Sequence, residues 1–223
     1  MNHPVMLPDI QIAPAEYSGL VMLTCLPSTG DPIPIGVRLE IAEYPADDGR
    51  LSGVRTAHSS GPILCAGREL IEVRWIEKLD GKLQSERIHW IDPRDEDGSI
   101  RLVMREIRTT DGGGTIEDVD CRFPLTIQPG DTWVATDRYI RGDRMAEASY
   151  RQTVEGACRV TIGERSSICL RISAIPLDSS ERRRAEQFIE CETGQMVCSR
   201  SMAGDEQANL LPDGLVWRIV CRL

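Results

Sequence analysis

The sequence predicts an all-β protein in which an antiparallel meander forms a curved sheet, a half-barrel or two fused sheets, with at most one short helix. Apolar and polar side chains alternate along successive runs, as in strands that bury one face. Two-residue turn signals, Asp80-Gly81 and Gly142-Asp143, separate pairs of these runs. A further alternating run, 214–221, ends the pattern as a closing strand. We therefore expect about ten to twelve antiparallel strands.

The stretch from Glu69 to Thr109 is the clearest element, a three-stranded antiparallel meander. Asp80-Gly81 suits a type I′ turn, which needs positive φ at both central residues. A turn at these residues predicts three cross-strand pairs: Ile71 with Trp90, Val73 with Ile88, and Trp75 with Glu86. The first two pairs join apolar side chains, and a shift of one residue would separate them.

A second hairpin is expected where residues 132–140 alternate and Gly142-Asp143 follows as a two-residue turn. This register predicts three pairs: Ile140 with Met145, Arg138 with Glu147, and Ala135 with Tyr150. The opposite charges of the second pair support it. Two further strands, 159–163 and 167–175, are predicted to pair next along the chain.

The remaining predicted elements are shorter. Strands are expected at 20–26, at 35–43 and, because proline lacks a ladder donor, as an edge strand at 62–66. Asp178 is a helix N-cap residue with Glu181 three positions later, which predicts the short helix over 179–187.

Three regions are predicted along the chain: an extended N-terminal arm over 1–18, an N-terminal β half over 19–118 and a C-terminal β half over 119–223. One continuous domain across both halves is the alternative. Prolines remove backbone donors from the arm, so residues 1–16 should lack regular structure. The glycine-rich stretch 111–114 reads as a turn or linker between the halves, because no P-loop lysine follows it.

The charge of the chain limits its partners. The net charge of −9 opposes binding to a phosphate backbone, so nucleic acid is not an expected partner. No apolar run has the roughly 18 residues of a transmembrane segment, and the N-terminal residues do not resemble a secretory signal. A cytoplasmic location is therefore expected, or a periplasmic or membrane-peripheral one if a signal or anchor was removed.

The eight cysteines show no C-x-x-C spacing, and only three histidines accompany them, so no metal site is predicted. In a reducing compartment they would be small buried thiols. A turn at Gly194-Gln195 places Cys191 opposite Cys198. A turn at Thr193-Gly194 instead places Cys191 against Met196 and Cys198 against Ile189. The first is preferred, because β-branched threonine tolerates positive φ poorly.

Two features could carry chemistry, but neither predicts a catalytic residue. The loop from Asp92 to Gly98 holds four carboxylates, yet its spacing does not match a calcium-binding EF loop, and a solvated acidic turn is expected. His58 and His89 are the plausible imidazole bases. The predicted register turns His89 away from the Trp90 face and opposite Glu72, as a cross-strand surface pair. No nucleophile elbow or zinc-protease motif is present.

The second half carries a resemblance. It combines Pro124–Trp133, an alternating pair of strands, Glu186–Gly194 and Val197–Arg200. This pattern resembles the curved antiparallel sheets of bacterial LolA- and LppX-like proteins. The resemblance implies a half-barrel that holds lipid acyl chains, and it transfers no site residue.

The expected function is non-catalytic: an accessory or scaffolding subunit that binds a larger protein complex, without a cofactor. The alternative is a carrier of a lipophilic small molecule or lipid in the concave face of the sheet, and an enzyme is third. Partner binding predicts exposed apolar residues on a flat surface. A carrier predicts an enclosed apolar pocket of several hundred cubic ångströms, and catalysis predicts a polar cleft that contains His89 or clustered acids.

Overall fold

A computed structural model gives the fold. It describes residues 5–27, 30–45, 49–65, 67–79, 82–95, 97–110, 114–141, 144–177, 184–202 and 216–222. This part of the chain is all β, as predicted, and contains fifteen strands and no helix. The first strands are β1 (Ile10–Pro14), β2 (Val21–Met22), β3 (Arg38–Pro45), β4 (Gly53–Cys65) and β5 (Arg68–Leu79). They are followed by β6 (Lys82–Asp92), β7 (Ile100–Thr109), β8 (Gly114–Phe123), β9 (Thr126–Ile127) and β10 (Thr132–Arg141). The last are β11 (Arg144–Ile162), β12 (Arg165–Pro176), β13 (Arg184–Glu190), β14 (Met196–Met202) and β15 (Val216–Arg222).

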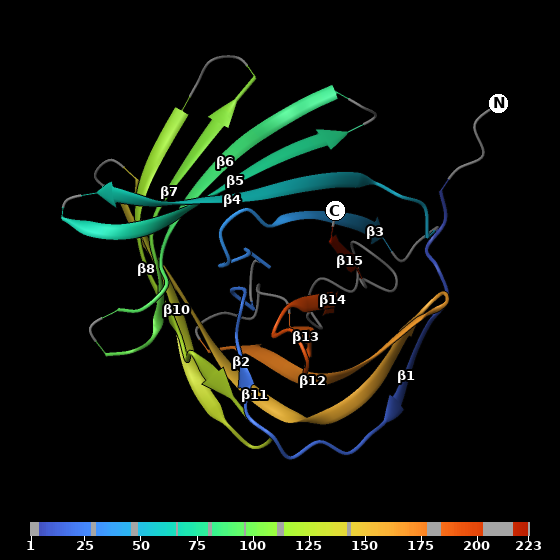
Figure 1. The fold of residues 1–223 in the computed structure, drawn as a ribbon. Helices are drawn as coiled ribbons and strands as arrows, with labels where there is room; N and C mark the ends of the chain where they lie inside the picture. The colour runs from blue at the N-terminus through green and yellow to red at the C-terminus, as the bar shows by residue number, and fades with distance from the viewer. Residues whose placement is uncertain are drawn as a thin grey trace.

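Thirteen of these strands form one antiparallel sheet in the order β1-β11-β10-β8-β7-β6-β5-β4-β3-β15-β14-β13-β12. Strand β11 also pairs with β12, so the sheet curls back on itself along this long strand. Figure 1 shows the strands wrapped around a central space. Strand β8 crosses the expected boundary at residue 118, and β3 pairs with β15, so strands from both predicted halves share this sheet.

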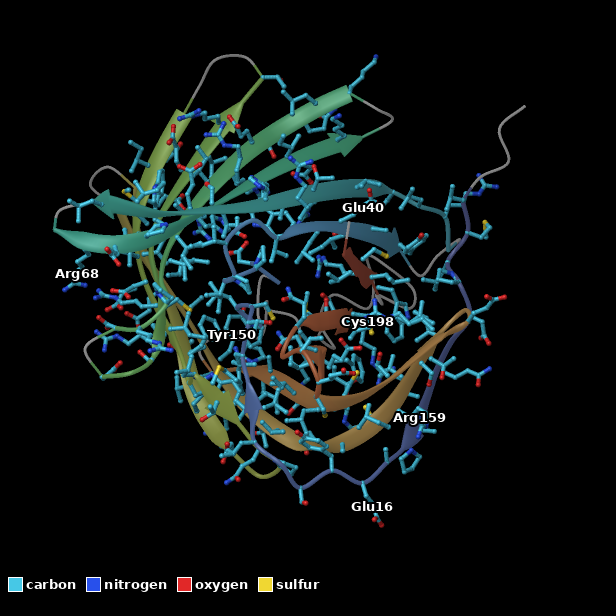
Figure 2. All side chains as sticks on the ribbon, in the orientation of Figure 1. Glu16, Glu40, Arg68, Tyr150, Arg159 and Cys198 are labelled. Carbon is cyan, nitrogen blue, oxygen red and sulfur yellow. The ribbon has the colours of Figure 1, made fainter. Side chains whose placement is uncertain are left out.

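The concave face of the sheet packs against the segment that carries β2, which lies in the central space (Figure 1). Leu23, Cys25 and Leu26 of this segment are buried against apolar side chains from strands on several sides. Backbone bonds hold the segment: Leu23 donates to Leu125, and Thr24 donates to Gly194. The short strand β2 pairs with β9, where the sequence predicted a longer strand over 20–26. Side chains therefore fill much of the enclosed space (Figure 2).

The opposite face of the sheet carries a second apolar cluster, made of Tyr44, Cys158, Val160, Cys169, Phe188, Val197, Cys198, Trp217 and Ile219. Leu7, Ile10 and Ile12 of the N-terminal arm pack against it. The prediction that residues 1–16 lack regular structure is wrong, because β1 pairs with the second half of β11. Burial of the arm's apolar side chains and the free edge of β11 together order this segment.

The predicted meander is present as β5, β6 and β7, but its register is wrong by one residue. Leu79 pairs with Lys82, as a turn at Asp80-Gly81 requires; these two turn residues lie outside the described part. A bulge then adds one residue to β6, so Glu72 faces Trp90 and Val73 faces His89. The physical reason is burial across the whole sheet: Ile71 and Ile91 become partners and both are buried.

The register of the second hairpin is confirmed. Strands β10 and β11 pair Ile140 with Met145, Arg138 with Glu147, and Ala135 with Tyr150. Strands β11 and β12 contain the predicted pair 159–163 and 167–175 except for residue 163, which follows the end of β11, and β15 is the closing strand. No bulge interrupts β10–β11, so the turn alone determines its register.

Two predictions near the C-terminal half are wrong. Residues 184–187 belong to strand β13 and not to a helix; the rest of the proposed helix, up to residue 183, lies outside the described part. Cys198 faces Phe188, and the backbone of Cys191 donates to Ile168 on β12. A bulge after Phe188 and a loop from Glu190 to Gln195 replace both two-residue turns that the sequence suggested.

Candidate functional site

A row of alternating charges crosses five neighbouring strands on the concave face. From β15 to β6 it consists of Arg218, Glu43, Arg55, Glu77 and Arg87, and we call it the charge row. Successive nitrogen–oxygen distances along it are 2.9, 3.5, 3.3 and 3.6 Å. Its side chains are 26–40% exposed, so this part of the concave face is reached by solvent.

A buried triad lies beside the charge row. Asp31, which is fully buried, accepts a hydrogen bond from the indole nitrogen of Trp75 and lies 2.5 Å from Nδ1 of His89. Two backbone hydrogen bonds hold Asp31 in the central space: the amide of Leu26 donates to the carbonyl of Asp31, and the amide of Gly30 donates to the carbonyl of Leu26. An inward segment and two sheet strands together build the triad.

A buried ion pair adjoins His89. Arg105 on β7 is the cross-strand neighbour of His89, and its guanidinium lies 2.8 Å from the carboxylate of Glu117 on β8. Glu117 is 1% exposed. A carboxylate at this depth stays ionised only if it is paired, so the Arg105–Glu117 contact holds both side chains in place.

These groups surround a cavity of about 250 Å³, and we call it the arginine cavity. Its polar lining consists of Arg55, Glu77, Ser85, Arg87, His89, Arg105, Ser199 and Arg218, and its apolar lining of Ile41, Trp75 and Met196. This volume is about eight times the volume that one molecule occupies in liquid water, so the cavity can hold a small molecule. Four guanidinium groups against one lining carboxylate make the wall rich in donors.

Two buried nitrogen atoms at the cavity have no hydrogen-bond partner in the part of the chain that the structure describes. They are Nε of Arg87 and Nε2 of His89. Both side chains lie two residues apart on β6, and therefore on the same face of the strand. Buried polar atoms are normally paired, so unpartnered nitrogens in two neighbouring residues that line a cavity point to a place for a polar ligand.

The electrostatics at Arg87 point the same way. Burial, followed by the charges of Arg55 and Arg105, lowers the pKa of the Arg87 guanidinium. Its carboxylate partner Glu77 is shared with Arg55. Burial alone would raise the pKa of Glu77, but a hydrogen bond from Ser85 and the two arginine charges hold that pKa below its usual range. Arg87 therefore shares the carboxylate of Glu77 with Arg55.

The structure confirms the predicted surface position of only some of the residues that the sequence singled out. His58 is exposed, as a surface residue, whereas His89 is 5% exposed and lies on the concave face, so the predicted surface pair with Glu72 is wrong. The bulge in β6 reverses the face of His89. The acidic loop is not a solvated turn throughout: Asp92 and Asp95 are buried and lie within 4 Å of arginines, among them Arg68 at the edge of the molecule (Figure 2).

The residues that sequence reasoning missed are Asp31 and the arginines of the cavity. Asp31 lies in a loop 58 residues from His89, and no spacing signal connects them. The arginines occupy inward positions that a half-buried strand usually gives to apolar residues. Within the described residues, no group of three or more His, Cys, Asp or Glu side chains is arranged to hold a metal ion.

A second cavity, of about 390 Å³, adjoins the first at Met196, which lines both. We call it the valine cavity. Val37, Leu39, Val197 and Val220 form its apolar wall, and Thr24, Arg165, Glu190, Thr193 and Gln195 contribute polar groups. It is less polar than the arginine cavity and offers space for an apolar group.

No protein-family model, curated protein or solved structure matches this chain. Within its described part, no helix has the length and apolar character needed to cross a membrane. The chemistry of the cavity residues is thus what the functional interpretation rests on.

Proposed function

We propose that the protein binds a small oxyanion, a molecule with a phosphate or carboxylate group, in the arginine cavity. The observation that carries the proposal is the pair of unpartnered nitrogens, Nε of Arg87 and Nε2 of His89, in the wall of a cavity with four guanidinium groups. Guanidinium groups bind carboxylates and phosphates through short charge-assisted hydrogen bonds. An anion would also offset the burial, and the repulsion by Arg55 and Arg105, that lower the pKa of Arg87.

The chain is acidic overall, so long-range attraction does not bring an anion to it. The local arrangement has to supply the affinity. The charge row contains three arginines and two glutamates, and Arg87 at its end shares one carboxylate with Arg55. This arrangement favours an anion at the Arg87 end.

Isothermal titration of inorganic phosphate into the purified protein tests the proposal. The Arg87→Gln variant should weaken binding by about 10- to 100-fold, the cost of a hydrogen bond to a charged group. The matched control is Arg74→Gln on the neighbouring strand β5. Arg74 is 45% exposed and pairs with Glu72 and Glu86, so its loss should leave phosphate affinity within about twofold, as expected for a distant surface charge.

Two results would contradict the proposal. If phosphate does not bind to the wild-type protein, the proposal is wrong. Equal losses in the Arg87 and Arg74 variants would assign the binding to general surface charge instead of to the cavity.

A second candidate function is transport of a lipophilic or amphiphilic small molecule in the concave face. The valine cavity supports it, because its apolar wall adjoins the arginine cavity at Met196. An anionic head beside Arg87 and an apolar group beyond Met196 would use both spaces. Titration with dodecanoate tests this: binding tighter than that of acetate supports a carrier, and equal affinity contradicts it.

The accessory-subunit hypothesis stays a prediction. Binding to a protein complex through the outside of the sheet gives no role to the charges on its concave face, whereas burying charges costs free energy that must be offset. Co-purification of a stoichiometric partner whose binding is lost on substitution of convex-face residues would support that hypothesis.

A further inference from the structure

The hydrogen-bonding state of His89 restricts which oxyanions fit, and this inference rests on the proposed function. Asp31 accepts a hydrogen bond from Trp75 at Oδ1 and lies 2.5 Å from Nδ1 of His89 at Oδ2. A carboxylate in this position holds the imidazole proton on Nδ1. In the neutral ring Nε2 then carries a lone pair and no proton, so it accepts and does not donate.

The two unpartnered atoms on β6 therefore need opposite partners. Nε of Arg87 carries a proton and requires an acceptor, whereas Nε2 of His89 requires a donor. Alternate residues on a strand are about 6 to 7 Å apart along its axis, so one small ligand can reach both nitrogens. An ion that has only hydrogen-bond acceptors would place an oxygen lone pair against the lone pair of Nε2 of His89, and the two would repel each other.

We propose that the cavity selects oxyanions that carry their own hydrogen-bond donor, namely hydrogen phosphate or a 2-hydroxycarboxylate, over ions of the same shape and charge without one. The anionic oxygens bind Arg87 and its neighbouring guanidinium groups. The hydroxyl donates to Nε2 of His89. Sites built to bond a hydroxyl strongly reject the analogue that lacks it, because their own buried groups stay unpaired.

The groups around the imidazole are consistent with this polarity. Several elements contribute charged side chains around it: Asp31 contacts the ring directly, Arg105 is paired with Glu117, and the same cavity is lined by Arg55, Glu77, Arg87, Arg105 and Arg218. The arginines of β4, β6 and β7 are paired with glutamates, and Asp31 contacts the imidazole directly.

Two matched pairs of probes test the selectivity by titration calorimetry. At about pH 8, above the second pKa of phosphate groups, phosphate and sulfate are both tetrahedral dianions, but only phosphate carries a proton. Lactate and propionate differ in the same way by one hydroxyl. The expected result is a preference of more than about tenfold for phosphate over sulfate and for lactate over propionate. If phosphate binds more tightly than lactate, the donor is the hydroxyl of a phosphate group; if lactate binds more tightly, it is the hydroxyl of a 2-hydroxycarboxylate.

The outcomes separate the inference from the proposed function. If none of the four ions binds, the proposed function fails. If phosphate and sulfate bind equally and Arg87→Gln weakens both, the oxyanion site stands and the selectivity is overturned. A preference that persists in the His89→Gln variant also overturns it, because the glutamine amide can donate as well as accept.

A measurement on the unaltered protein covers the case in which His89→Gln does not fold. The ring nitrogen signals of His89 in NMR of the phosphate-free protein at about pH 8 should show a proton on Nδ1 and none on Nε2. A proton on Nε2 under these conditions would contradict the assigned role of this nitrogen as an acceptor.

Discussion

Nδ1 of His89 lies 2.5 Å from a carboxylate oxygen of Asp31, although 58 residues separate them in the chain. Asp31 comes from the segment inside the curled sheet, and His89 comes from the sheet itself. This contact therefore fixes the segment against the wall of the arginine cavity. The second ring nitrogen of His89, a residue that lines this cavity, is buried and has no partner among the described residues.

Replacement of Asp31 by asparagine should destabilise the protein. The amide oxygen can still accept from Trp75, but the amide group is neutral, and its NH2 faces the protonated Nδ1 of His89. Loss of a buried hydrogen bond to a charged group predicts a decrease in the free energy of unfolding of about 2–3 kcal/mol, measured by urea denaturation. Asp9→Asn is the control, since Asp9 is exposed, and it should unfold at nearly the wild-type urea concentration.

Replacement of Arg105 by glutamine should be more damaging, because it removes a guanidinium that lies 2.8 Å from the buried carboxylate of Glu117. We expect a loss of about 3–5 kcal/mol in the free energy of unfolding. The double variant Arg105→Leu with Glu117→Leu should recover most of it, since a buried ion pair and an apolar pair of similar volume are often equivalent. Arg108→Gln on the exposed side of the same strand is the control and should have little effect. A double variant as unstable as Arg105→Gln would show that the charges are not the cause.

Gly194 should tolerate no side chain. Its φ is +67°, and a Cβ there would lie 1.8 Å from the backbone oxygen of Met22, against which the loop packs. Gly194→Ala should therefore cost more than about 3 kcal/mol. Gly163 has a similar φ of +56° but open space around it, so Gly163→Ala should cost about 1–2 kcal/mol, the penalty of the left-handed backbone alone. Equal costs in denaturant unfolding would mean that the close approach to Met22 has no energetic weight.

The thiols should differ sharply in reactivity. Burial raises the pKa of Cys25 and of Cys198 to about 12. Because the thiolate is the reactive form, both should resist iodoacetamide in the native protein, whereas the exposed Cys221 should be alkylated. Peptide mapping by mass spectrometry after a short pulse checks this, with the urea-unfolded protein as the reference in which all three react. Rapid native labelling of Cys25 would contradict its place in the core.

The sequence was sufficient for the fold class and for registers set by a turn alone, as in β10 and β11. It failed where a bulge intervened. The extra residue in β6 shifted the register by one position, so His89 lies on the face of the sheet opposite to the predicted one. The irregularity after Phe188 likewise changed the cross-strand partner of Cys198. Local pairing rules do not predict bulges, because the gain comes from burial elsewhere in the sheet.

The candidate site depends on contacts that no local pattern encodes. Asp31 meets His89 only because the central segment folds into the curl of the sheet. The charge row also requires five strands in an order that differs from their order in the chain, with β15 beside β3. Alternation of residues along each strand reveals which side chains share a face, but not which strands are neighbours.

NMR of the side-chain nitrogens gives the most direct test of the central claim that an oxyanion binds between Arg87 and His89. On addition of phosphate, the Nε signal of Arg87 and the Nε2 signal of His89 should both shift with the same binding curve, while Nδ1 of His89 stays protonated and the Nε signal of Arg74 stays in place. Shifts at Arg74 as large as those at Arg87, or an unchanged Nε2 of His89 at saturating phosphate, would contradict the account.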